Sequence, residues 1–105
     1  MIELKKEFKK QGTLFQQIYK DSCLAIYRLS RQGMDNDKVY SWFEVFRITR
    51  RASDAFHNDD YEKYPNDEAF GTWAWSCSNE ESVRKVLKKH FKEHEPINNL
   101  ANLLS

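Results

Sequence analysis

The stretch VYSWFEVFRITRR, residues 39–51, restricts the fold more than any other part of the chain. Alternate side chains of an extended strand point to opposite faces of a sheet. One face of this strand would carry Tyr40, Trp42, Glu44, Phe46 and Ile48, and the other Val39, Phe43, Val45, Arg47 and Thr49. Both faces are substantially apolar, which is typical of a central strand. The sequence therefore predicts a β-sheet in which this segment is an inner strand.

Three further segments have the composition of strands. The runs TLFQQIYKD and SCLAIYRLSR, within residues 13–31, are rich in aromatic and branched side chains and meet at the turn-forming pair Asp21-Ser22, so they predict an antiparallel hairpin. Gly, Asn and Asp residues between positions 32 and 38 mark the next turn. In GTWAWSCS, Trp73, Trp75 and Cys77 alternate with small residues, which predicts a strand with one bulky face.

A helix is expected over residues 79–94. Ser78, followed three residues later by Glu81, predicts a capping box at its start, and Pro96 marks its end. Its apolar stripe consists of Val83, Val86, Leu87, His90 and Phe91. The opposite face is rich in lysine, so the stripe is expected to pack across the sheet.

The two ends of the chain carry weaker patterns. Residues 2–11 predict a short helix ended by Gly12, and an extended lead-in fits them nearly as well. Residues 97–104 place apolar side chains at helical spacing. We therefore expect a single α+β domain over residues 1–105, in which a four-stranded antiparallel sheet is packed by one long C-terminal helix, with short N-terminal and C-terminal helical segments.

Composition favours a folded, cytoplasmic protein. Forty per cent of the residues are hydrophobic and 31% are charged, which suits a packed core under a polar surface. The longest apolar runs span only a few residues, so neither a signal peptide nor a membrane span is expected.

Charge is unevenly distributed along the chain, although the net charge is only +1. Residues 1–51 have a net charge of +5, residues 52–82 of −7 and residues 83–105 of +3. The acidic part includes a polar, irregular crossing loop with two tyrosines, Tyr61 and Tyr64, that are expected to be exposed. This composition is suited to contact with a basic protein. The predicted partner-binding residues are Asp54, Asp59, Asp60, Tyr61, Glu62, Tyr64, Asp67 and Glu68.

Catalytic and metal-binding patterns are weak. The three glycines are far apart, which excludes a phosphate-binding loop, and no spacing joins a nucleophile with a base and an orienting acid. We therefore expect no enzyme, cofactor or metal. His90 and His94 share a helix face, but a third nearby ligand is missing. Cys23 and Cys77 both lie in predicted strands, so two reduced, buried thiols are expected rather than a disulfide.

Two other functions remain open. A small nucleic-acid-binding module would use the basic strand end and the basic helix, with Arg47, Arg50, Arg51, Lys85, Lys88 and Lys89 as contacts. A self-associating protein would form a dimer through the apolar tail residues Leu100, Leu103 and Leu104.

Four segments carry a resemblance to a known family. EFKKQGTLFQQIYKDSCLAIYRLS, FEVFRI, YPNDEAFGTWAW and NEESVRKVLKKHF occur in an order similar to that in a family of small bacteriophage and mobile-element proteins. The resemblance covers roughly residues 7–91, and residues 44–48 and 65–75 are its most specific parts. It implies no catalytic residues. It implies instead a protein that binds and inhibits host machinery, such as an RNA-guided defence nuclease, in the manner of an anti-CRISPR.

Overall fold

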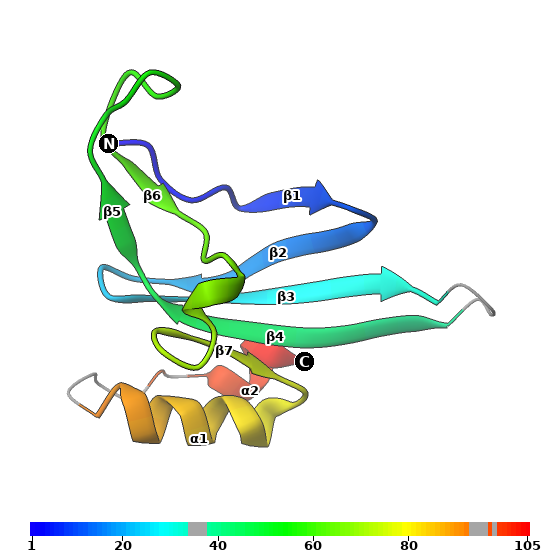
Figure 1. Cartoon of the computed structure of the whole chain (residues 1–105). Helices are drawn as coiled ribbons and strands as arrows, with labels where there is room; N and C mark the ends of the chain where they lie inside the picture. Colours follow the sequence, from blue (N-terminus) through cyan, green and yellow to red (C-terminus); the bar gives the residue numbers. More distant parts are fainter. Residues whose placement is uncertain (34–37, 93–96, 98) are drawn as a thin grey trace.

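The computed structural model describes residues 1–33, 38–92, 97 and 99–105, and it has the predicted α+β architecture. In this part of the chain, five antiparallel strands form one sheet in the order β1-β2-β3-β4-β7 (Figure 1). Their bounds are Glu7–Lys10 (β1), Thr13–Lys20 (β2), Leu24–Gln32 (β3), Val39–Arg47 (β4) and Ala74–Cys77 (β7). A smaller sheet pairs β5 (Thr49–Arg51) with β6 (Tyr61–Lys63). The helices are η1 (Asp67–Ala69, one 3-10 turn), α1 (Glu80–His90) and α2 (Leu100–Leu104).

The inner position of β4 is confirmed. It pairs with β3 on one side and, over residues 43–46, with β7 on the other, and both faces of this second half of the strand are packed. The predicted β2–β3 hairpin is also confirmed. Asp21 closes its turn, because the Asp21 carboxylate accepts hydrogen bonds from the backbone N–H groups of Cys23 and Leu24 at 2.7 and 2.9 Å.

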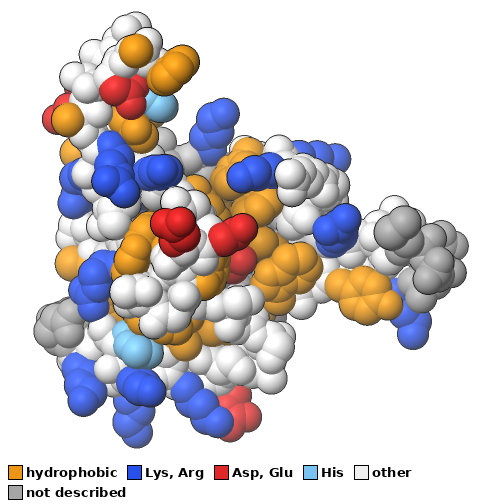
Figure 2. All heavy atoms as spheres, viewed as in Figure 1, with side chains coloured by type: hydrophobic (Ala, Val, Ile, Leu, Met, Phe, Trp, Pro, Cys, Tyr) orange, Lys and Arg blue, Asp and Glu red, His pale blue; other side chains and the backbone are white. Residues whose placement is uncertain are grey.

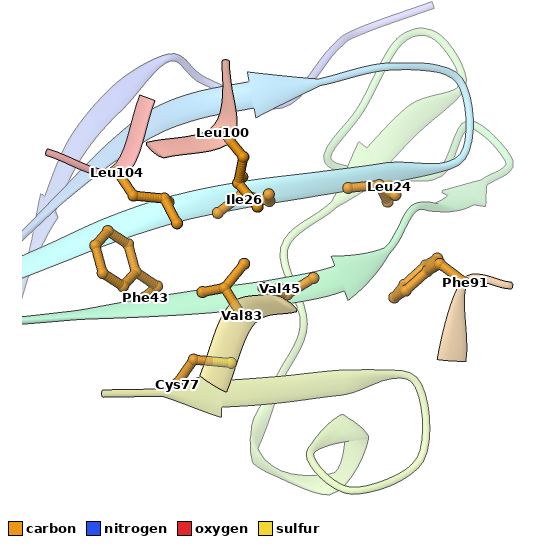
Figure 3. Packing of buried hydrophobic residues seen from close by; sticks show 9 residues of the cluster. All are labelled: Leu24, Ile26, Phe43, Val45, Cys77, Val83, Phe91, Leu100 and Leu104. Atoms are coloured by element: carbon orange, nitrogen blue, oxygen red, sulfur yellow. The ribbon is translucent and has the colours of Figure 1, made fainter. Parts of the chain in front are cut away.

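One core lies between the sheet and the two helices (Figure 3). Helix α1 supplies Val83 and its C-cap residue Phe91, and α2 supplies Leu100 and Leu104. The prediction of one long C-terminal helix is therefore wrong, because the structure has a helix of 11 residues and a separate one of 5 residues here. The sheet contributes Leu24, Ile26, Phe43, Val45 and Cys77. Burial of these apolar side chains holds both helices against one face of the sheet.

A second core covers the opposite face of the sheet. Its buried members are Leu4, Ala25, Tyr27, Leu29, Phe46, Ile48, Ala69 and Ala74. Aromatic side chains from β1, β2 and the 64–73 segment pack against them. The chain between β6 and β7 is thus a structural layer, and its inner side chains are not available to a partner.

The prediction of a four-stranded sheet is wrong in two places. Residues 7–10 form the edge strand β1 instead of a helix, because Phe8 pairs across the ladder with Phe15 and the two rings stack at 4.5 Å. Residues 39–51 are not one strand either. The chain bends at Ile48, whose side chain is buried in the second core, and β5 then enters the smaller sheet.

Two local predictions in the C-terminal half also need correction. Helix α1 is capped by Asn79, whose Oδ1 accepts the N–H of Ser82 at 2.9 Å, so Ser78 is not the cap and the helix ends at His90. Trp73 and Trp75 do not share a face. Gly71 adopts a φ of 90° and Trp73 lies in the resulting turn, so its indole packs on the second core while that of Trp75 packs on the first.

Candidate functional site

The acidic segment predicted to bind a partner divides into an inward-facing part and an outward-facing part. Glu62 belongs to the first part, because its side chain is only 3% exposed. Its Oε1 accepts the backbone N–H of Leu4 at 3.1 Å and lies 3.1 Å from Lys20 Nζ. Arg50 Nη2 lies 3.8 Å from its Oε2. Glu62 therefore ties the N-terminal segment and β2 to the smaller sheet.

Tyr64 also points inward, so the expectation that it is exposed is wrong. Its hydroxyl donates a 2.6 Å hydrogen bond to Glu44 Oε1. Four rings lie around it at centroid distances of 4.9 to 5.6 Å, namely Phe8, Phe15, Tyr27 and Phe46. Burial raises the pKa of Tyr64, and the nearby Glu44 charge raises it further. Tyr64 is a core residue.

The outward-facing part is the segment 52–60 between β5 and β6, which we call the projecting loop. Figure 1 shows it standing beyond the end of the main sheet. The carboxylate of Asp54 organises it, because its Oδ1 accepts the backbone N–H groups of Phe56 and His57, each at 2.9 Å. Tyr61 donates to Asp54 Oδ2 at 3.1 Å, and the His57 ring stacks on Tyr61 at 3.7 Å. The loop is therefore ordered by its own side chains.

Hydrogen bonding keeps the Asp54 carboxylate charged. The bond with the His57 ring, at 3.0 Å, and that with the Phe56 N–H lower the pKa of Asp54 to about 2. Asp59 and Asp60 are exposed farther along the loop. The terminal ammonium of Met1 lies 2.8 Å from Asp59 Oδ2, and Ser53 donates its backbone N–H to Asp60 Oδ1 at 3.0 Å. The loop therefore presents three carboxylates.

Phe56 is an exposed aromatic residue that the sequence analysis did not single out. Its side chain is 92% exposed, far more than any other large hydrophobic residue of the described chain. Figure 2 shows hydrophobic, acidic and histidine side chains gathered on the projection at the upper left. The sequence did contain an indication of this exposure. In SDAFHNDD, Phe56 lies among polar residues and belongs to no alternating or helical apolar pattern.

Asp67 and Glu68 are exposed but belong to a different place. They form the first part of η1, where Asn66 Oδ1 accepts the N–H of Glu68 at 3.2 Å. The strand β6 separates η1 from the projecting loop (Figure 1). The eight predicted contact residues therefore form two exposed groups and a buried pair.

The predicted nucleic-acid contacts do not form one surface. Arg47 lies against α1, where its guanidinium donates to the His90 carbonyl at 2.6 Å and sits 4.5 Å from the centre of the Phe91 ring. Arg50 donates to the Ser22 carbonyl at 3.3 Å, in addition to its contact with Glu62. Arg51 is exposed on the smaller sheet.

The helical members of that set lie on α1, at the opposite end of the view in Figure 1. Lys85 pairs with Glu81 at 3.5 Å, whereas Lys88 and Lys89 are exposed at the C-terminal end of the helix.

The residues predicted to form a dimer contact are mostly buried within the chain. Leu100 and Leu104 are buried in their own chain and Leu103 is partly buried, so the first two are not available to a second copy.

Histidine and cysteine side chains are dispersed. His90 stacks on Trp75 at 4.0 Å, and His94 lies outside the described residues. Both cysteines are free, but Cys23 is exposed in the turn before β3, so the expectation of two buried thiols is wrong for it. Burial raises the pKa of Cys77 to about 11. Across residues 1–33, 38–92, 97 and 99–105, no three His, Cys, Asp or Glu side chains are grouped closely enough to hold a metal ion.

Neither helix α1 nor any other helix in the described residues has the length and apolar character that crossing a membrane requires. No protein-family model, curated protein or solved structure matches the chain.

Proposed function

We propose that this chain is a non-enzymatic interaction protein of a bacteriophage or other mobile element, and that it binds and inhibits a basic host protein. The contact is made by the projecting loop, with Phe56 as the anchor and the loop carboxylates around it. The observation that carries the proposal is the 92% exposure of Phe56 in a turn that is held by two hydrogen bonds to the Asp54 carboxylate.

An exposed phenyl ring is unfavourable in water, and its burial releases about 25 cal/mol per Å2 of apolar surface. Aromatic anchors that fill a pocket supply much of the affinity of protein interfaces. The Asp54 hydrogen bonds fix the loop backbone before binding, so little conformational entropy remains to be lost there. A pre-organised loop with an aromatic tip is therefore suited to insert into an apolar pocket of a partner.

The charge of the loop selects the partner. Asp54 stays ionised because its pKa is about 2, and Asp59 and Asp60 lie exposed beside it. Carboxylates around an aromatic anchor attract a positively charged surface and disfavour an acidic one. An RNA-guided nuclease holds its guide–target duplex in a positively charged channel, and so presents such a surface. This class of partner is also the one that the family resemblance implies.

The test is inhibition of target-DNA cleavage by purified RNA-guided nucleases. The variants are Phe56→Ser and the pair Asp59→Lys with Asp60→Lys. Val39→Ser is the matched control, because Val39 is also exposed, at 64%, but lies on the β3–β4 hairpin away from the loop. We expect inhibition by the unmodified chain and by Val39→Ser, and its loss in both loop variants.

Equal inhibition by Phe56→Ser would show that the loop is not the contact. Failure of the unmodified chain to inhibit any nuclease of this class would reject the class of partner. Glu62 is left out of the charge-reversal variant because it is buried, and its reversal would unfold the chain instead of testing the contact.

A further inference from the structure

A second surface feature lies where β5, β6, η1 and the turn before β7 meet. It is a pocket of about 230 Å3. Its lining consists of Arg51, Lys63, Tyr64, Asn66, Glu68, Ala69, Thr72 and Trp73. Figure 2 shows Lys and Arg side chains gathered at the base of the projection, over the smaller sheet. The pocket does not include Phe56 or the loop carboxylates, so it is separate from the contact proposed above.

The β5–β6 ladder places two cations on one side of this pocket. Thr49 pairs with Lys63 and Arg51 pairs with Tyr61, so Arg51 and Lys63 share a face while Arg50 and Glu62 share the other. Arg50 is neutralised by Glu62. In contrast, the side chains of Arg51 and Lys63 are exposed and form no ion pair with another described residue. The Glu68 carboxylate also lines the pocket, but the two cations exceed it in charge, so together they can hold an anionic group such as a phosphate.

Trp73 supplies an aromatic surface to the same pocket. The turn after Gly71 turns it away from Trp75, and its side chain remains partly exposed. No described ring stacks on it, although aromatic stacking is common elsewhere in this chain. An indole face that lines a pocket beside cations suits a planar, anionic ligand, because every nucleobase offers a π-face for stacking.

The polar lining distinguishes between planar ligands. Glu68 offers a carboxylate acceptor, Thr72 a hydroxyl, and Asn66 the N–H groups of its side-chain amide, since its Oδ1 already accepts from Glu68. A nucleobase has donors and acceptors on its edge that these groups can meet. A phosphotyrosine ring has none, and it would leave the Glu68 carboxylate facing an apolar edge.

We infer that this pocket binds a nucleotide, either free or as one unit of a single strand. The base stacks on Trp73 with its edge toward Glu68 and Asn66, and the phosphate lies between Arg51 and Lys63. A duplex is excluded as the ligand of this pocket, because its base faces are covered by their neighbours in the stack.

The test measures binding of a fluorescein-labelled oligo(U) of about ten nucleotides, a length in the range of known single-strand sites, by anisotropy at low salt. Unlabelled oligo(U), UMP, AMP, inorganic phosphate and a phosphotyrosine peptide serve as competitors. The variants are Trp73→Leu and the pair Arg51→Gln with Lys63→Gln. The matched control is Lys88→Gln with Lys89→Gln, which makes the same change in charge on α1.

We expect binding to weaken about tenfold or more in both pocket variants and to change little in the α1 control. The slope of log affinity against log salt should fall by about one in the Arg51→Gln, Lys63→Gln variant. Competition by UMP or AMP supports a free nucleotide as ligand, and competition by the unlabelled oligomer alone supports a single strand. Because Arg51 and Lys63 are exposed, their variant tests the site even if Trp73→Leu lowers stability.

Three results would overturn the inference. They are the absence of oligo(U) and mononucleotide binding, equal weakening by the α1 control, and displacement by inorganic phosphate or the phosphotyrosine peptide as readily as by nucleotides. Phe56→Ser should leave oligo(U) binding unchanged, so failure of this inference and failure of the proposed protein contact are distinguishable.

Discussion

The hydroxyl of Tyr64 donates a 2.6 Å hydrogen bond to Glu44 Oε1 beneath the chain segment that the sequence had marked as exposed. The bond joins the segment after β6 to the inner strand β4, within a cluster of aromatic rings. It therefore fixes the second layer on the sheet, and with it the base of the projecting loop and the wall of the pocket.

Tyr64→Phe tests this bond with almost no change in volume. The partly buried Glu44 carboxylate would lose one of its two side-chain donors, so the free energy of unfolding should fall by about 1–3 kcal/mol. Urea denaturation measures the loss. In a Glu44→Gln background the same substitution should cost less, and an equal cost in both backgrounds would show that the charge of Glu44 does not matter.

Glu44 should also affect how stability depends on pH. Burial raises the pKa of Glu44 more than its hydrogen bonds from Tyr64 and Trp42 lower it. A carboxyl group whose pKa is raised in the folded state adds to folding stability when it is protonated. This stabilisation is present below the unfolded pKa of about 4.3 and is lost as pH rises through the folded value. Glu44→Gln should therefore compare more favourably with the unmodified chain at pH 7 than at pH 4. The reverse order in thermal melts would contradict the burial of this charge.

Charge reversal should lower stability strongly at Glu62 and change it little at Asp60. Glu62→Lys leaves Lys20 and Arg50 facing a buried cation, so it should cost about 3–5 kcal/mol or prevent folding. Asp60 is exposed, and Asp60→Lys should change stability by no more than about 1 kcal/mol. Melting temperatures of the two variants provide the comparison, and similar values for both would be inconsistent with the inward position of Glu62.

Asp54→Ala should disorder the projecting loop without unfolding the domain. The substitution removes the carboxylate acceptor of the Phe56 N–H, so protection of this amide against hydrogen exchange should be lost, whereas the His57 N–H keeps its 3.3 Å bond to the carbonyl of residue 54. Acid should act in the same way. The stabilisation is complete above the unfolded pKa of about 3.9 and is lost as pH falls through the folded value of about 2. Retained protection of the Phe56 amide in the variant would mean that Asp54 does not organise the loop.

Arg47→Ala should destabilise the docking of α1. The change removes the hydrogen bond to the His90 carbonyl and the cation–π contact with Phe91, with an expected loss of about 1–3 kcal/mol. Arg84→Ala, which removes an exposed arginine of the same helix, is the control and should cost well under 1 kcal/mol. Equal effects in urea denaturation would argue against a structural role for Arg47.

The sequence allowed prediction of the elements whose pattern is local. Alternation along residues 39–51 predicted an inner strand with two apolar faces, which the structure has over Val39–Arg47. The apolar stripe predicted a helix over residues 79–94, of which the structure has Glu80–His90. Strand β1 was missed because Leu4 and Phe8 have helical spacing. What determines its conformation is the stack of Phe8 on Phe15, a contact that closes only when β1 and β2 pair.

The candidate site was predictable only in outline. The acidic composition of residues 52–68 indicated an interaction surface, but it did not separate Glu62 from Asp59 and Asp60. A strand as short as β6 gives too little alternation to show which side faces inward, and the partners of Glu62 are Leu4, Lys20 and Arg50, all distant in sequence. Phe56 was missed because exposure depends on the turn that Asp54 closes.

The central claim is that the ring of Phe56 anchors a partner. Its most direct test is the dissociation constant of the inhibited nuclease for the unmodified chain and for Phe56→Ser, with Val39→Ser as the control and melting temperatures recorded for all three. An anchor that fills a partner's pocket should weaken binding by about 30-fold or more when removed, at unchanged melting temperature. A dissociation constant for Phe56→Ser equal to that of the unmodified chain would contradict the claim.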